Sequence, residues 1–391
     1  MSKIVFLKWS SYCDLDMIDA FERLGFQVVC CRLVNGIQTS VEEIENAIIS
    51  QVTCSRPEFV FSFNYIPNVS KVCQKRELPY VSWVYDSPYI HVYSYTVINP
   101  CNHIFLFDYA LYDKLKKQGI TTVEYLPLAV NERRLERLNN TDLFKNKFES
   151  DISFVGSLYD ETKHRLFDRF QSIEPYTKGY LNAIMAAQKL VYGYNFIEDL
   201  LTPQIVAEME KEYPTDPNAL TVMKPEEIYA DYVLNRQVTA IERKEILQIL
   251  GKKFPQYRIR LYTNNKTQFW GIDNKGPIDY YNEMPYVFLN SRINLNISLR
   301  SIKTGIPLRA FDIMGCGGFL LSNYQQELLE YFNADIDFVY YNNYEDLVEK
   351  VEYYLSHEKE RREIAENGSY KVLHEHTMVM RAKKIIKKVL E

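Results

Sequence analysis

No apolar run in this sequence approaches the roughly 18 residues that a membrane-spanning helix needs. The first residues, MSKIVFLKWSSY, contain only four consecutive apolar side chains, which is too few for the core of a signal peptide. We therefore expect a cytoplasmic protein without an integral membrane segment.

Basic clusters and cysteine motifs are also missing. Apart from the terminal RAKKIIKKVL there is no dense block of Lys and Arg, and the net charge is −5, so we expect no nucleic-acid partner. The seven cysteines include no C-x-x-C pair and have no histidine at the spacing of metal ligands. Reduced thiols are the expectation, with neither zinc nor disulfides.

The first third of the chain instead shows an alternation of strand-like and helix-like segments, which is typical of βαβ units around a parallel sheet. KWSSY follows the first strand in place of G-x-G-x-x-G, so no dinucleotide is expected at that turn. The sequence predicts strands over residues 4–7, 26–33, 59–63, 80–85, 103–107 and 122–126, with helices over residues 15–24, 41–49 and 109–118.

A length of 391 residues favours two domains, because a single hydrophobic core stops growing at roughly 250 to 300 residues. Residues 131–149 are polar and lack an apolar period, and DISFVGS then begins a new strand pattern, so we place the boundary near Ser150. Residues 164–250 have helical patterning and predict an insertion in the second domain. This insertion would act either as a lid over the acceptor cleft or as a packing or oligomer surface.

The stretch at residues 293–321, INLNISLRSIKTGIPLRAFDIMGCGGFLL, is the most informative in the chain. Its first six residues alternate apolar and polar, as in a strand, and Pro307 suits the first turn of a following helix. We expect Gly315 to end that helix before a second strand begins at Phe319. Such a strand–turn–helix unit aims backbone N–H groups and a positive dipole end at a crevice that suits a phosphate.

This stretch resembles the donor-binding segment of GT-B glycosyltransferases, whose family-4 type reads E-P-F-G-x-x-x-x-E-A-M-A-C-G-x-P. It is most similar to that of the CgeB-like glycosyltransferases, which reads P-x-R-x-F-E-x-M-x-x-G-G. Asp312 stands in place of the ribose-binding Glu, and Thr304 stands where the first Glu of the E-x7-E pair would be. The matching residues are Pro307, Arg309, Phe311, Asp312, Met314, Gly317 and Gly318.

The resemblance implies an α/β fold of the GT-B class, in which two Rossmann-like domains face each other across a cleft. The first domain would take the acceptor and the second the donor, and the last helix, from Thr377, would cross back onto the first domain. As an alternative, that basic helix would lie on a membrane surface.

The resemblance also implies the residues of the donor site. FVGSL at residues 154–158 resembles the opening strand of the donor domain. Cationic side chains and a helix dipole would then replace a metal ion at the leaving diphosphate, so we expect neither a metal nor a cofactor. The implied phosphate ligands are Gly156, Ser157, Lys163, Arg300, Gly305 and Arg309, and the implied nucleoside ligands are Asp312, Ile278 and Tyr281.

Acceptor chemistry is expected at the carboxyl ends of the first-domain strands, in the loops at residues 8–14, 64–65 and 86–88. Asp86 ends an apolar strand and is the candidate general base or acceptor-hydroxyl ligand. The alternative is that Asp86 only caps an Asp-Ser-Pro turn. His91 is a second candidate base, with a packed histidine as the alternative.

These features predict a glycosyltransferase that moves a sugar from a nucleotide-diphosphate sugar, with a UDP-sugar as the expected donor, to an acceptor that the sequence does not identify. One alternative is a non-catalytic nucleotide- or sugar-binding protein on the same fold, because Thr304 replaces a catalytic Glu. The other is a nucleotide-sugar epimerase, which would need a set of acid and base residues facing the sugar. The oligomeric state stays open.

Overall fold

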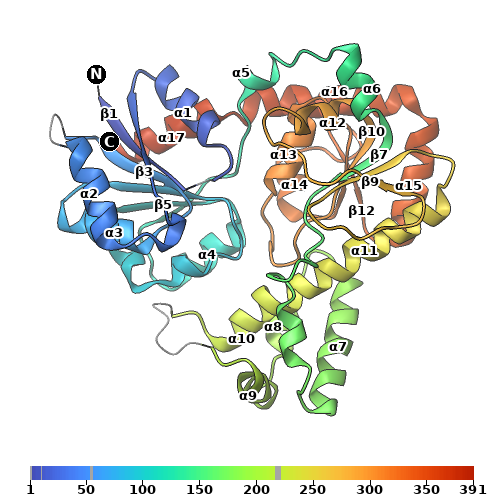
Figure 1. The fold of residues 1–391 in the computed structure, drawn as a ribbon, viewed down its shortest axis with the longest axis horizontal. Helices are drawn as coiled ribbons and strands as arrows, with labels where there is room; N and C mark the ends of the chain where they lie inside the picture. Colours follow the sequence, from blue (N-terminus) through green and yellow to red (C-terminus); the bar gives the residue numbers. More distant parts are fainter. Residues whose placement is uncertain (1, 10, 53–55, 216–221) are drawn as a thin grey trace. The chain divides into compact units, whose positions relative to one another are not determined.

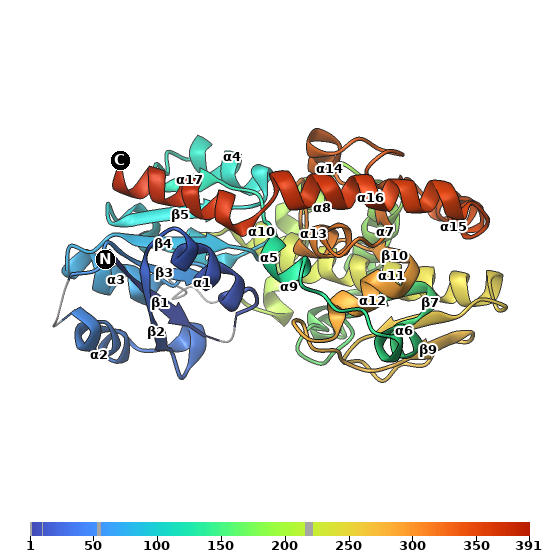
Figure 2. The same cartoon turned by 90° about the horizontal axis from the view of Figure 1, so that it is seen from above.

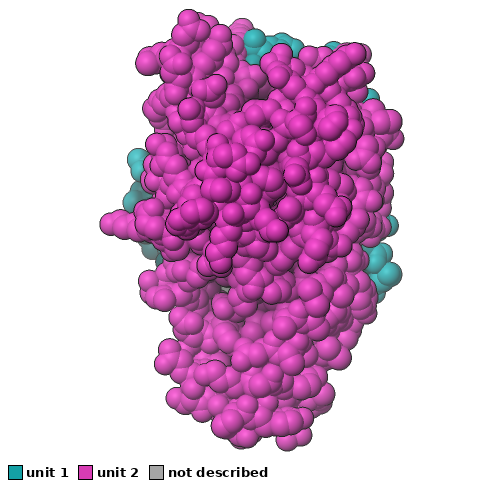
Figure 3. All heavy atoms as spheres, turned by 90° about the vertical axis from the view of Figure 1, so that its right-hand side faces the viewer, with its two compact units in different colours: residues 1–136, 219–222, 373–391 teal, residues 137–218, 223–372 magenta. Residues whose placement is uncertain are grey.

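The computed structural model describes residues 2–9, 11–52, 56–215 and 222–391. The chain forms two compact units, coloured separately in Figure 3. Unit 1 comprises residues 1–136, 219–222 and 373–391, and unit 2 comprises residues 137–218 and 223–372. Within the described ranges, no helix combines the length and the apolar character that a membrane crossing requires.

Unit 1 is built on a six-stranded parallel sheet in the order β2-β1-β3-β4-β5-β6. Its strands are β1 (Lys3–Lys8), β2 (Gln27–Arg32), β3 (Phe59–Phe63), β4 (Tyr80–Val84), β5 (Asn102–Leu106) and β6 (Val123–Tyr125). Its helices are α1 (Asp14–Arg23), α2 (Val41–Val52), α3 (Pro67–Lys75), α4 (Tyr109–Lys117), α5 (Glu132–Leu135) and α17 (Met378–Leu390), with the short turns η1 (Gly36–Gln38), η2 (Ile90–Tyr93) and η3 (Tyr95–Ile98).

Helices cover both faces of the unit 1 sheet, α1 and α17 on one face and α2, α3 and α4 on the other (Figure 1). This division follows from right-handed crossovers, because the chain moves one way along the sheet from β1 to β2 and the other way from β2 onward. Every residue of the central strands β3 and β4 is therefore buried.

The C-terminal helix α17 is part of unit 1. Thr377 forms a β-bridge with Val130, and Met378 N donates to Val130 O at 2.8 Å. Arg381 Nε donates to Pro127 O at 2.9 Å, which links α17 to the segment that follows β6. Figure 2 shows α17 from above.

Unit 2 contains a second six-stranded parallel sheet, in the order β12-β11-β10-β7-β8-β9. Its strands are β7 (Ser150–Val155), β8 (Ile259–Tyr262), β9 (Ile272–Asn274), β10 (Ser291–Asn296), β11 (Leu320–Asn323) and β12 (Val339–Tyr341). Its helices outside the insertion are α6 (Asp142–Phe148), α12 (Met284–Asn290), α13 (Leu308–Gly315), α14 (Gln326–Tyr331), α15 (Tyr344–Ser356) and α16 (Glu358–Glu375), the last three residues of which count with unit 1.

The predicted helical insertion lies between β7 and β8. It has a hydrophobic core of its own, which includes Leu181, Ile197, Met209 and Val233. The described elements of the insertion are η4 (Leu166–Phe170), α7 (Pro175–Lys189), α8 (Ile197–Leu200), α9 (Pro203–Glu212), α10 (Pro225–Ile228), the π-helical η5 (Tyr229–Leu234) and α11 (Asn235–Lys253).

Unit 2 begins at Arg137, whereas the sequence places the boundary near Ser150. The polar stretch before β7 contains α6, which packs against α12 of unit 2. The rings of Phe144 and Tyr286 stack at 4.0 Å, and Lys147 Nζ lies 2.7 Å from Glu283 Oε1. Contacts between side chains distant in sequence, rather than local polarity, set this boundary.

Helix α13 ends at Gly315, as expected from the sequence. The left-handed residue that turns the chain away from the helix is Gly317, with φ of +79°. Gly318 meets a second constraint, because a Cβ there would lie 2.7 Å from Asn294 Nδ2 and 2.9 Å from Phe288 O. Both glycines are therefore required to turn the chain into β11.

Candidate functional site

The donor-binding segments predicted from the sequence surround the carboxyl end of the unit 2 sheet. Strands β7, β10 and β11 are neighbours, and the loops after them carry residues 156–157, 297–307 and 324–325. Ser298 N donates to Asn323 Oδ1 at 2.8 Å, and Gln325 Nε2 donates to Gly305 O at 2.8 Å. Two of these loops are therefore held together by hydrogen bonds.

Asp312 lies buried on α13. Tyr280 Oη donates to its Oδ1 at 3.0 Å, and Arg309 Nη1 lies 3.3 Å from its Oδ2. Tyr281, a predicted nucleoside ligand, stands edge-on to the ring of Tyr280 at 5.0 Å, and Ile278, the other one, is half-buried nearby in the chain. Sequence periodicity gives no signal that separates two adjacent tyrosines in a turn.

Arg309 occupies the first turn of α13 and keeps 27% of its side chain exposed. Its guanidinium contacts Met284 Sδ and lies 5.5 Å from the centre of the Phe288 ring. Among the described residues, only Nη1 has a hydrogen-bond acceptor, so Nε and Nη2 keep their donors for a ligand. A half-exposed guanidinium beside a helix N-terminus suits a phosphate oxygen.

Arg300 is placed differently from the prediction. Its guanidinium pairs with buried Glu242 through Nε at 2.8 Å and Nη2 at 2.9 Å, and Nη1 donates to Val191 O at 3.0 Å. Nη2 also donates to Lys189 O at 3.0 Å, and the group stacks on the Tyr192 ring at 3.8 Å. Arg300 therefore ties the loop after β10 to the helical insertion, and its donors are committed within the protein.

The loop after β7 is also largely occupied by local bonds. Gly156 N donates to Tyr262 O at 3.0 Å, and the Ser157 hydroxyl donates to Glu161 Oε2 at 2.8 Å while accepting from Tyr159 N. Lys163 is exposed, and no carboxylate of the described chain forms an ion pair with it. Of the predicted ligands in this loop, Lys163 is the one that retains its charge for a bound anion.

Thr304 occupies the position of the first Glu of the E-x7-E pair. The structure places the carboxylate of another residue beside it. Thr304 Oγ1 donates to Oε1 of the buried Glu327 at 2.8 Å, and Glu327 N donates back to Thr304 O at 3.2 Å. Glu327 belongs to α14, 23 positions further along the chain. The motif spacing could not reveal it, because this contact depends on how α14 packs.

In unit 1, polar side chains gather where β3 and β4 end. Asn64, fully buried with φ of +56°, donates through Nδ2 to Asp86 Oδ2 at 2.7 Å and accepts from Tyr85 N at 3.0 Å. Asp86 itself is exposed. Ser87 Oγ instead donates to the buried Asp108 at 2.7 Å, so Asp108 fastens the turn after β4.

Asp14 at the start of α1 is a candidate that the sequence reasoning did not single out within the loop at residues 8–14. Its side chain is buried and accepts a hydrogen bond from Ser11 Oγ. Burial raises the pKa of Asp14 to about 6, although the Ser11 bond and the charge of Lys8 act in the opposite direction. His91 is half-buried beside Tyr89, and burial lowers its pKa.

Comparisons with known proteins agree with this architecture. A family described as glycosyl transferase-like matches residues 236–387, which include α13. No curated protein matches the chain. A glycosyltransferase from Rickettsia africae aligns over 100% of this chain and 99% of its own, at 12% identity and a TM-score of 0.53.

Two further solved structures cover the whole of this chain. The Anabaena protein HepE in complex with UDP and glucose aligns over 100% of its own length, at 10% identity and a TM-score of 0.51. Sucrose-phosphate synthase from Thermosynechococcus elongatus aligns over 99%, at 10% identity and a TM-score of 0.55. The fold is that of GT-B glycosyltransferases. This confirms the predicted α/β class with its helical insertion, while the CgeB-like subtype stays a prediction.

Proposed function

We propose that this protein is a glycosyltransferase that binds a nucleotide-sugar donor at the carboxyl end of the unit 2 sheet. The observation that carries the proposal is the arrangement of Arg309, Asp312 and Tyr280 around the first turns of α13. There, a guanidinium with spare donors and a buried carboxylate lie next to each other. HepE, which shares the fold, has been solved with UDP-glucose, which favours a UDP-sugar as donor.

In this proposal, Arg309 binds the diphosphate and becomes more important as negative charge develops on the leaving group. Lys163 and the N–H groups at the start of α13 add to the same stabilisation. Asp312, held by Tyr280, accepts hydrogen bonds from the ribose hydroxyls. These residues supply the positive charge, so no metal ion is needed in the transfer step.

We assign the acid–base chemistry on the acceptor to unit 1. A general base works best when its pKa lies close to the working pH, and Asp14 meets that condition with a pKa of about 6. Asp86, exposed and oriented by Asn64, would bind the acceptor hydroxyl. The base would remove the proton of that hydroxyl as the hydroxyl oxygen bonds to the anomeric carbon and the nucleoside diphosphate leaves.

A screen of nucleotide sugars by thermal unfolding tests the donor site, because a ligand of the folded state raises the midpoint through RT ln(1 + [L]/Kd). The best nucleotide sugar is then incubated with the protein, and released nucleotide and free sugar are measured. We expect stabilisation together with slow release of UDP. Stabilisation without any turnover would favour a binding protein, and a new sugar epimer without release of UDP would favour an epimerase.

A further inference from the structure

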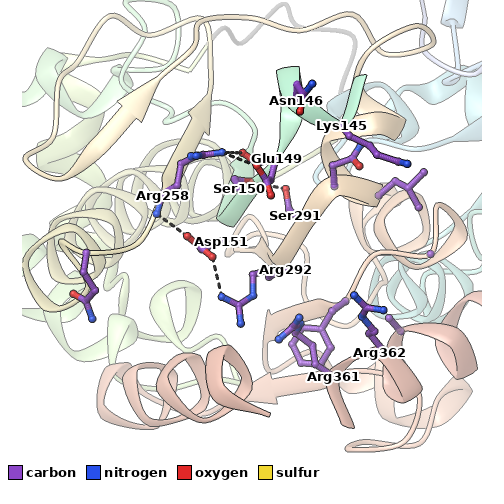
Figure 4. Close-up of a pocket in the computed structure, with 16 residues that line it drawn as sticks. Lys145, Asn146, Glu149, Ser150, Asp151, Arg258, Ser291, Arg292, Arg361 and Arg362 are labelled. Carbon is purple, nitrogen blue, oxygen red and sulfur yellow. Dashed lines mark hydrogen bonds and ion pairs between the residues drawn. The ribbon is translucent and has the colours of Figure 1, made fainter. Parts of the chain in front are cut away.

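Unit 2 carries a second polar pocket at the opposite, amino end of its sheet (Figure 4). Its volume is about 750 Å³. Ser150 and Ser291, the first residues of β7 and β10, line it together with Arg258, which precedes β8. The donor segments follow the other ends of the same strands, so this pocket plays no part in the proposed donor site.

The pocket carries an excess of positive charge. Five cationic side chains line it against two carboxylates, which leaves three net positive charges. Asn146, Gln256 and Asn290 add amide groups to the lining. The cations are Lys145, Arg258, Arg292, Arg361 and Arg362, and the carboxylates are Glu149 and Asp151.

Three of the arginines have carboxylate partners. Arg258 Nη1 lies 3.0 Å from Glu149 Oε2, and Arg292 Nη1 lies 2.9 Å from Asp151 Oδ1, as the dashed lines in Figure 4 show. Arg362 Nη2 pairs with Glu358 Oε1 at 2.5 Å one helical turn earlier in α16. These pairs fix three guanidinium groups around the pocket.

Arg361 is the exception. It is only 5% exposed, and within the described chain it forms no ion pair with a carboxylate. Its Nη1 donates to Tyr354 O at 2.6 Å, and burial, followed by the positive charge of Arg292, lowers its pKa. A buried charge is costly unless a counter-charge accompanies it, and Glu358 and Asp151 act on Arg361 through their charges without forming an ion pair with it. An anion bound in the pocket would therefore stabilise Arg361.

We propose that this pocket binds a phosphorylated ligand, with Arg361 as its central contact and Arg292 and Arg362 beside it. Guanidinium groups match phosphate oxygens in pairs, and the amide side chains of Asn146 and Gln256 suit hydroxyl groups of the same ligand. The volume lies within the range of pockets for small molecules. The phosphate belongs either to a soluble metabolite or to a lipid headgroup. This inference stands independently of the proposed transfer reaction.

Titration calorimetry with inorganic pyrophosphate, in the absence of divalent metal, tests the site. We expect binding to the wild-type protein and at least about tenfold weaker binding to Arg361→Gln and to Arg362→Gln, because each loses a charge-assisted contact. The matched control is Lys211→Gln, an exposed cation of the insertion that also pairs with an acid in its own helix. It should bind pyrophosphate as the wild type does.

Arg362→Gln and one further variant, Arg309→Ala, keep the test decisive. Arg361 is buried, so Arg361→Gln could unfold the protein. In that case the binding measured with Arg362→Gln tests the proposal. This change should not unfold the protein, because 71% of the Arg362 side chain is exposed. Pyrophosphate could also bind at α13, and Arg309→Ala removes that contact. Loss of binding in Arg309→Ala with full binding in Arg362→Gln would overturn the proposal, and so would a wild-type protein that does not bind pyrophosphate.

Vesicles that contain phosphatidic acid distinguish the two sources of phosphate. Sedimentation of the wild-type protein with these vesicles, lost in Arg362→Gln and kept in Lys211→Gln, would assign the pocket to a lipid headgroup. Binding of pyrophosphate without any binding to vesicles would assign it to a soluble phosphorylated metabolite.

Discussion

Arg300 and Arg309 belong to the same motif-bearing segment, yet the structure places them in opposite circumstances. The guanidinium of Arg300 is buried against Glu242 and two backbone carbonyls. That of Arg309 lies half-exposed on the first turn of α13, with donors to spare. A charge whose bonds are all made within the protein stabilises the fold, whereas a charge with unused donors is available to a ligand.

The largest effect is expected for Arg300→Ala. Removing this side chain leaves the fully buried carboxylate of Glu242 without a cation, with the Tyr192 hydroxyl still donating to it, which costs about 3 to 5 kcal/mol of unfolding free energy. Urea denaturation measures this loss. Combining Arg300→Ala with Glu242→Gln should restore part of the stability, and additive losses in the double variant would show that the two side chains are not coupled.

Arg309→Ala should behave in the opposite way. The fold should be retained, because 27% of the Arg309 side chain is exposed and Tyr280 still donates to the buried Asp312 after the change. Loss of a charge-assisted contact to the leaving diphosphate should lower kcat/KM by about one to two orders of magnitude, or ~1.5 to 3 kcal/mol. Steady-state kinetics with the best donor measures it, and a variant within about twofold of wild type would rule out the phosphate role.

Among the carboxylates, Asp14 is a buried charge of unit 1, and burial raises its pKa to about 6 from the ordinary value of 3.8. Well below pH 3.8 both the folded and unfolded chains hold this proton. As the pH rises from 3.8 to about 6, the unfolded chain releases the proton while the folded chain still holds it, so stability is lost over this range. Asp14→Asn should therefore stabilise the protein at pH 7, by up to about 3 kcal/mol, and lower turnover.

Thermal unfolding at pH 4 and pH 7 checks the Asp14 prediction, with Asp86→Asn as the control in the same unit. The stabilising effect of Asp14→Asn should be largest at pH 7 and much smaller at pH 4. An equal effect at both pH values, or unchanged turnover, would show that Asp14 is a structural residue with no part in proton transfer.

Asp312→Asn and Asp86→Asn should separate donor binding from turnover. Asp312 lies on the proposed donor helix, so its change should weaken nucleotide affinity at least tenfold, or about 1.4 kcal/mol. Asp86 belongs to unit 1, and its change should leave nucleotide affinity nearly unchanged while transfer falls. Calorimetric titration of each variant with the best nucleotide measures these affinities. If Asp86→Asn abolished nucleotide binding and Asp312→Asn did not, the donor site would belong to unit 1 and the acceptor site to unit 2.

The periodicity of apolar residues predicted the ends of most unit 1 strands to within one or two residues of their observed positions. It missed α3, a helix of nine residues that begins at Pro67. Arg309 and Asp312 could be predicted because they belong to one contiguous motif. Their partner Tyr280, the carboxylate of Glu327 and the commitment of Arg300 depend on packing between distant segments, which no local pattern records.

The smallest effect is expected for the removal of divalent metal. The negative charge that develops on the leaving diphosphate is met in our proposal by Arg309, Lys163 and the start of α13. Turnover should therefore stay within about twofold of its starting value when EDTA is added.

Donor hydrolysis and transfer, measured with and without the chelator, check this prediction, and Arg309→Ala under the same conditions gives the sharper comparison. If a metal ion carried the charge, the wild-type activity would vanish in EDTA and return with Mn²⁺ or Mg²⁺, whether or not Arg309 is present. If Arg309 carries it, the chelator should leave both proteins unchanged, and the whole difference between them should persist.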